Sequence, residues 1–143
     1  MKTKPLVYLI EDDLDDQYIF KMVTKELEIN LNLTTFEDGL TAYKALTKVC
    51  EIEDGRHLHL PDLILLDLNL PVWDGKKTLS ELKKVSHLQG IPIVIYTTSK
   101  SEYDAADCYR LGANSFISKA AEYENLRQQI KSICTNWFKT VTL

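Results

Sequence analysis

The feature that most constrains this chain is an unbroken apolar run, residues 63–66, that ends on a carboxylate at Asp67. Such runs suit a strand that is buried on both faces, as in a parallel sheet with helices on each side. Ligands of these sheets bind just beyond the carboxyl ends of the strands. A carboxylate is costly to desolvate there unless a cation or hydrogen bonds compensate, so Asp67 is a candidate functional residue.

Length and composition indicate one domain over residues 1–143, with an apolar tail at about 137–143. The chain is 45% hydrophobic, and its net charge of -4 argues against nucleic-acid binding as the main function. It shows no signal peptide and no apolar run long enough to span a membrane. Cys50, Cys108 and Cys134 lack CxxC spacing, which favours reduced thiols in a cytoplasmic protein.

Five short apolar segments alternate with five segments of helical pattern. The predicted strands are 6–10, 31–36, 63–67, 93–97 and 115–118, and the predicted helices are about 15–27, 40–50, 75–85, 101–111 and 121–138. Asp74 is a plausible N-cap and Gly112 a plausible C-terminal cap, while residues 51–60 form the one long loop. This alternation predicts a doubly wound parallel α/β sheet with right-handed crossovers.

Polar side chains follow four of the strands: Glu11 and Asp12, Asp67, Thr97, and Lys119. Three carboxylates at one sheet edge repel one another, and a hard divalent cation removes the conflict. Magnesium keeps several waters, so a few carboxylates and a backbone carbonyl are enough protein ligands. Metal, hydroxyl and ammonium together suit a transferring phosphoryl group, with Asp67 as the nucleophile.

Each of these residues also has an ordinary interpretation. Asp15 and Asp16 fit the solvated first turn of a helix, where a negative charge complements the helix dipole, and we prefer that for both. Thr97 alone could be a strand residue and Lys119 alone a surface lysine. His57 and His59 form an H-x-H pair that we interpret as part of a solvated loop. Only the joint order of the acids, threonine and lysine favours a phosphoryl site.

That joint pattern closely resembles the receiver domain of two-component response regulators over nearly the whole chain. The matching segments are 10–13, 61–75, 93–98, 111–113 and 116–119. The resemblance implies a flavodoxin-like (βα)5 fold with strand order 2-1-3-4-5. It also implies Asp67 as phosphoacceptor, Glu11 and Asp12 as the acid pair, and Thr97 and Lys119 as phosphoryl-sensing residues. The backbone carbonyl of Asn69 would complete the Mg²⁺ site.

More narrowly, the chain is similar to stand-alone regulators that partner bacterial phytochromes and hybrid kinases. This likeness rests on the sequence Leu-Asp-Leu-Asn-Leu-Pro at residues 66–71, on the long loop before strand 63–67 and on the aromatic pair at 137–138. It implies a sensor or hybrid histidine kinase as partner, and a homodimer as a candidate assembly. The apolar tail either covers the domain's own core or meets a partner, and both alternatives stay open.

Two positions depart from the family pattern. Ala120 stands where proline usually follows the lysine, and Phe116 occupies a switch position that is often tyrosine or histidine. Phe116 has no hydroxyl, so packing is its only means of signalling. A cis peptide before a non-proline residue costs about 2.5–4 kcal/mol, so we predict a trans Lys119–Ala120 bond. We expect the long lysine stem still to bring its ammonium within salt-bridge distance of Asp67.

The favoured function is a Mg²⁺-dependent phosphoacceptor that switches protein contacts or relays phosphate, with no DNA-binding output and no turnover beyond its own Asp67. The alternative is a phosphatase of the haloacid-dehalogenase type, but its second aspartate, two residues after the nucleophile, is replaced here by Asn69. A flavin-binding domain is a third alternative. The acids after the first strand would repel the FMN phosphate, which argues against it.

Overall fold

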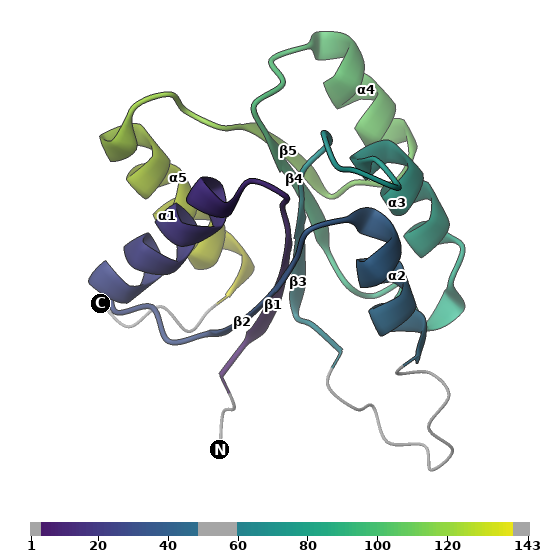
Figure 1. Ribbon diagram of the computed structural model, residues 1–143, viewed down its shortest axis with the longest axis horizontal. Helices are drawn as coiled ribbons and strands as arrows, with labels where there is room; N and C mark the ends of the chain where they lie inside the picture. Colours follow the sequence, from purple (N-terminus) through teal and green to yellow (C-terminus); the bar gives the residue numbers. More distant parts are fainter. Residues whose placement is uncertain (1–3, 49–59, 139–143) are drawn as a thin grey trace.

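The computed structural model of the protein describes residues 4–48 and 60–138. Five parallel strands form one sheet in the order β2-β1-β3-β4-β5 (Figure 1). The strands are β1 (Leu6–Ile10), β2 (Asn32–Phe36), β3 (Leu63–Leu66), β4 (Ile93–Thr97) and β5 (Ser115–Ser118). This order confirms the predicted flavodoxin-like, doubly wound fold.

A helix follows each strand, as predicted. The helices are α1 (Leu14–Glu26), α2 (Gly39–Lys48), α3 (Gly75–Lys83), α4 (Glu102–Arg110) and α5 (Tyr123–Trp137). A short 3₁₀ helix, η2 (Ser86–Leu88), was not predicted and follows the end of α3. Cys50, His57 and His59 lie outside the described residues. Within the described residues, no helix combines the length and the apolar character that a membrane crossing requires.

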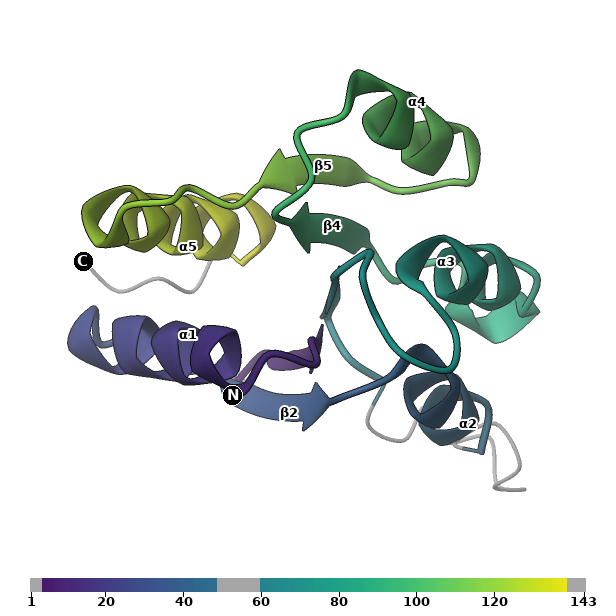
Figure 2. The ribbon, with the colours of Figure 1, turned by 45° about the horizontal axis from the view of Figure 1, so that its top comes forward.

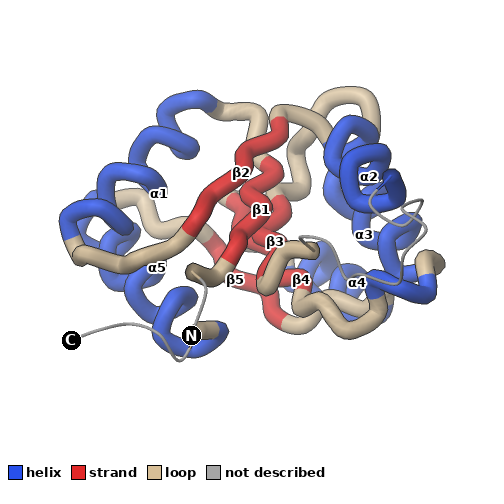
Figure 3. Tube along the Cα trace, turned by 90° about the horizontal axis from the view of Figure 1, so that it is seen from below, coloured by secondary structure: helices blue, strands red, loops and turns tan. Residues whose placement is uncertain are grey.

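The helices cover both faces of the sheet. Helices α1 and α5 lie on one face, and α2, α3 and α4 lie on the other (Figures 1 and 3). Because strand side chains alternate, Val7 and Leu9 pack under α1 and α5, while Tyr8 and Ile10 pack toward α2 and α3. Central strands β3 and β4 are buried throughout, as the apolar run predicted.

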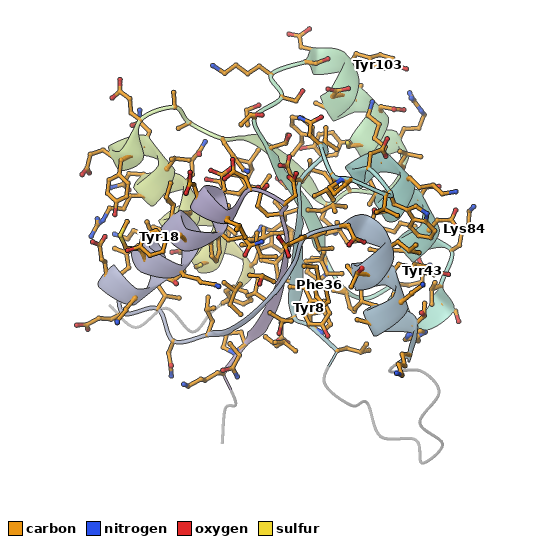
Figure 4. The ribbon with its side chains drawn as sticks, in the orientation of Figure 1. Tyr8, Tyr18, Phe36, Tyr43, Lys84 and Tyr103 are labelled. Carbon is orange, nitrogen blue, oxygen red and sulfur yellow. The ribbon has the colours of Figure 1, made fainter. Side chains whose placement is uncertain are left out.

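The two edge strands, β2 and β5, are less buried than the central ones. On β2, Phe36 lies beside Tyr8 of β1, with ring centroids 4.9 Å apart (Figure 4).

Cys108 and Cys134 are buried thiols that belong to the cores on opposite faces of the sheet, so they cannot pair with each other.

Caps start the helices close to the carboxyl ends of the strands. Asp13 accepts hydrogen bonds from the N–H groups of Asp15 and Asp16 at the start of α1. Asp74 caps α3 by accepting from the N–H of Lys77, as predicted. Gly112 has φ 108°, a left-handed conformation that confirms the predicted C-terminal cap of α4.

The aromatic pair at the end of α5 packs onto the domain itself. Phe138 is buried, and the half-buried Trp137 packs against the same core between the sheet, α1 and α5. Figure 2 shows α1 and α5 side by side over this core. For these two residues the structure supports packing onto the domain's own core rather than contact with a partner. Val141 and Leu143 lie outside the described residues.

Gly75, at the start of α3, lets the loop after β3 pack tightly. Its N–H donates to the Leu68 carbonyl at 2.8 Å. A Cβ at this position would lie 2.2 Å from the carbonyl oxygen of Asp67 and 2.6 Å from the Cα of Leu68. Because these are backbone atoms, a larger residue can enter only if the segment that carries Asp67 moves.

We therefore expect Gly75→Ala to lower the free energy of unfolding by about 1–3 kcal/mol. Urea denaturation would measure the change. Gly90→Ala is the matched control, because a Cβ there has no atom within 4 Å, and it should change stability by less than about 0.5 kcal/mol. Equal stabilities for the two variants would contradict the close packing of Gly75.

Candidate functional site

Asp67 is the first residue after β3 and lies at the carboxyl edge of the sheet. Its N–H donates to the carbonyl of Ile10 on the neighbouring β1 at 3.0 Å. Its Oδ1 accepts a hydrogen bond from the N–H of Leu68 at 2.7 Å. The residue is 7% exposed, so its carboxylate is largely withdrawn from solvent.

Three carboxylates meet at this edge, as the sequence predicted. Glu11, Asp12 and Asp67 each offer an oxygen, and these oxygens lie within 4.8 Å of one another. Glu11 and Asp67 are buried, whereas Asp12 is exposed. Asp12 and Asn69 line one open polar groove beside the cluster. Oxygen donors at this spacing fit a hard divalent cation that keeps part of its water shell, and such a cation would relieve their repulsion.

Lys119 brings a positive charge into the same site. Its Nζ donates to Glu11 Oε1, lies 2.8 Å from Asp16 Oδ2 and lies 3.7 Å from Asp67 Oδ2. The Lys119–Ala120 peptide bond is trans. Both predictions for this turn are therefore confirmed, because the lysine reaches Asp67 from a trans peptide.

The prediction for Asp16 was wrong in one respect. Asp15 and Asp16 do occupy the first turn of α1, and Asp15 is exposed. Asp16, however, is only partly exposed and forms an ion pair with Lys119, which also contacts Glu11. The first turn of α1 starts close to the acid pair, but this sequence position is equally typical of a solvated helix start and did not identify the ion pair.

Burial and charge act against each other in this cluster. Burial raises the pKa of the Glu11 carboxyl to about 7, although the Lys119 ammonium that hydrogen-bonds to it works in the opposite direction. Burial also disfavours the charged form of Lys119, but hydrogen bonds to Asp16 and Glu11 outweigh this and raise the pKa of Lys119 above its ordinary value. The ammonium therefore stays charged at neutral pH.

Thr97 ends β4 and is fully buried. Its Oγ1 accepts a hydrogen bond from the N–H of Ser99 at 3.3 Å, and its carbonyl accepts from the N–H of Lys119 at 2.6 Å. The backbone of Thr97 is thus joined directly to the residue that carries the ammonium.

A polar chain that the sequence analysis missed leads from Thr97 to two helices. The Ser99 hydroxyl donates to Asp104 of α4 at 2.7 Å. Asp104 also pairs with Lys76 of α3 at 2.9 Å, and Lys76 reaches Asp107 at 3.0 Å. The loop after β4 is therefore connected to the packing of α3 against α4.

Phe116, the predicted switch residue, lies on β5 away from the carboxylate cluster. It is half-buried and packs against the core under α2, α3 and α4. Its N–H donates to the hydroxyl of Tyr109 on α4 at 3.1 Å. The backbone of Phe116 therefore joins β5 to α4.

Comparison with known proteins identifies the class that this fold and site define. The family model described as the response regulator receiver domain matches residues 7–131. The chain therefore belongs to the response regulator receiver domain family, a component of two-component signalling. This membership does not favour the phosphatase alternative.

Individual relatives are similar over almost their whole length. Response regulator Rcp1 of Synechocystis sp. is 36% identical over 96% of this chain and 92% of its own. The phosphorylated cyanobacterial phytochrome response regulator RcpA has a TM-score of 0.85 at 35% identity, over 99% of both chains. The Mn²⁺-bound form of Rcp1 has a TM-score of 0.82 at 36% identity, over 97% of this chain and 98% of its own.

A raised pKa at Glu11 predicts that divalent-cation binding depends on pH. The pKa of Glu11 is about 7 without a cation, and a carboxylate must lose its proton to become a ligand. The apparent affinity for Mg²⁺ should therefore fall as the pH drops below about 7, by up to about tenfold per pH unit for one proton. Calorimetric titration at several pH values measures this slope.

Glu11→Gln serves as the control, because it removes the titrating group and keeps the size of the side chain. It should bind Mg²⁺ more weakly and with a smaller pH dependence. An affinity of the unmodified protein that stays constant between about pH 6 and pH 8 would contradict a role for Glu11.

Proposed function

We propose that Asp67 accepts a phosphoryl group from a histidine kinase in a Mg²⁺-dependent reaction. One observation carries the proposal: a buried strand-end aspartate lies among two further carboxylates, with the Lys119 ammonium 3.7 Å from its Oδ2. Family membership and the similarity to a phosphorylated regulator support it. The chain acts as one receiver domain that phosphorylates and dephosphorylates only its own Asp67.

Each residue of the site has a distinct role in this proposal. The carboxylates of Glu11, Asp12 and Asp67, with the backbone carbonyl of Asn69, would hold Mg²⁺. When bound, the ion neutralises charge on the phosphoryl oxygens. A carboxylate oxygen of Asp67 forms the new bond to phosphorus while the bond from phosphorus to the kinase imidazole nitrogen breaks. The electron pair of the broken bond returns to the imidazole.

Phosphorylation adds close to two negative charges at the edge of the sheet. In the proposed switch the Lys119 ammonium pairs with the new phosphoryl oxygens, and the Thr97 hydroxyl donates to one of them. The hydrogen bond that joins Lys119 N–H to the Thr97 carbonyl couples the two residues. The change then passes to Phe116 and to the surface formed by α4, β5 and α5, which would present the signal to a protein partner or a phosphate relay.

The relatives support a choice of the kinase class. RcpA is a cyanobacterial phytochrome response regulator, and it is similar to this chain over 99% of both chains. A sensor or hybrid histidine kinase, with a phytochrome-type sensor as the first choice, is therefore the proposed phosphodonor.

Replacing the phosphoacceptor should abolish the reaction. With acetyl phosphate and Mg²⁺, Asp67→Asn and Asp67→Ala should give no phosphorylated protein by intact-mass measurement, because the nucleophilic oxygen is lost. Asp15→Asn is the control, since Asp15 is an exposed carboxylate of the neighbouring helix turn. It should be phosphorylated at the normal rate. Undiminished phosphorylation of either Asp67 variant would refute the assignment.

We also propose that the protein forms a homodimer that phosphorylation strengthens. Exposed tyrosines on α4, Tyr103 and Tyr109, give this part of the surface aromatic contact area (Tyr103 is labelled in Figure 4). Sedimentation equilibrium should show dimers whose share rises with acetyl phosphate and Mg²⁺. The Asp67→Asn variant should not respond to the phosphodonor. A protein that stays monomeric at high concentration under both conditions would contradict the proposal.

A further inference from the structure

One side chain of α5 holds the backbone on both sides of Lys119. The Gln129 amide nitrogen donates to the carbonyl of Ser118 at 2.7 Å. The amide oxygen of the same residue accepts from the N–H of Ala120 at 2.9 Å. Since Ser118 and Ala120 flank Lys119, one planar amide fixes the turn from which the lysine side chain starts.

A third contact determines how the amide is oriented. The Tyr96 hydroxyl lies 3.2 Å from the Gln129 amide oxygen. Burial raises the pKa of Tyr96 to about 12, so the hydroxyl is protonated and donates. Two donors therefore face the amide oxygen and one acceptor faces the amide nitrogen. The ring of Tyr96 also lies under the ammonium, with Lys119 Nζ 5.6 Å from its centroid.

The residue after the lysine is essential to this arrangement. Ala120 supplies an N–H that a proline at the same position would lack. The turn can thus be held by a hydrogen bond to α5 rather than by the restricted backbone of a proline ring. Its other anchor is the hydrogen bond from Lys119 N–H to the carbonyl of Thr97, at 2.6 Å.

We propose that Gln129 is a positioning residue, which fixes the turn at 118–120 so that the Lys119 ammonium meets the phosphoryl group on Asp67. This inference rests on the proposed function and deepens it. Lysine has a flexible four-carbon stem, and Glu11 and Asp16 compete with Asp67 for its ammonium. Holding both flanking peptides restricts the positions that the ammonium can reach.

Gln129→Met tests the proposal, because it keeps the length of the side chain and removes both hydrogen-bonding groups. Gln128→Met is the matched control, since Gln128 is the exposed neighbour on the same helix. The Gln129 variant should be phosphorylated by acetyl phosphate about two- to tenfold more slowly, the range expected for losing a hydrogen bond that acts on the transition state. Its Mg²⁺ affinity should be unchanged, because it touches none of the three carboxylates.

A double mutant separates positioning from general destabilisation. In a Lys119→Ala background, Gln129→Met should have no further effect on the phosphorylation rate, since the residue acts through the lysine. An equal loss in both backgrounds, or a normal rate for Gln129→Met, would overturn the proposal. Gln129→Asn, whose shorter amide cannot hold both peptides, should behave like the methionine variant and replaces it if that variant fails to fold. Failure of the unmodified protein to be phosphorylated would instead refute the proposed function.

Discussion

The Lys119 ammonium is the group on which the rest of the site depends. Glu11 and Asp67 are buried carboxylates, and each is expensive to keep charged without a partner. Lys119, itself buried, contacts Glu11 and Asp16 directly and lies near Asp67. Removing one member of such a cluster leaves uncompensated charge in the interior. The lysine therefore allows Glu11, Asp16 and Asp67 to lie close together at one sheet edge without a bound cation.

The fold makes this cluster possible because every strand delivers its last residue to the same edge. The parallel pairing of β1, β3 and β4 brings Glu11, Asp67 and Thr97 from distant parts of the chain to that edge. Gly75 then packs against the backbone that carries Asp67, and Asp13 and Asp74 start helices beside it. The rigid part of the site comes from hydrogen-bonded strands, while its adjustable part, Lys119, comes from a loop.

The strands, the helices and most of the site could be predicted because their signals are local. An apolar run that ends on Glu11, Asp67 or Thr97 predicts a strand, and it also predicts that this polar residue lies at the carboxyl edge of the sheet. The role of Asp16 could not be read in this way, because its sequence position is equally typical of a solvated helix start. Gln129 gave no local signal at all, since its partners at 118 and 120 approach it only when α5 packs on the sheet. Tertiary packing decides both cases.

In the proposed switch, the resting contacts of Lys119 would also set the free energy that is available. The ammonium is already paired with Glu11 and Asp16, so pairing with a phosphoryl group would exchange partners rather than add one. The net gain is then the difference between two charge-assisted interactions, which is smaller than either alone. A small difference keeps the two conformations close in free energy, as a reversible switch requires. Asp16, which lies outside the three-carboxylate cluster, would thus help to set how readily the proposed switch responds.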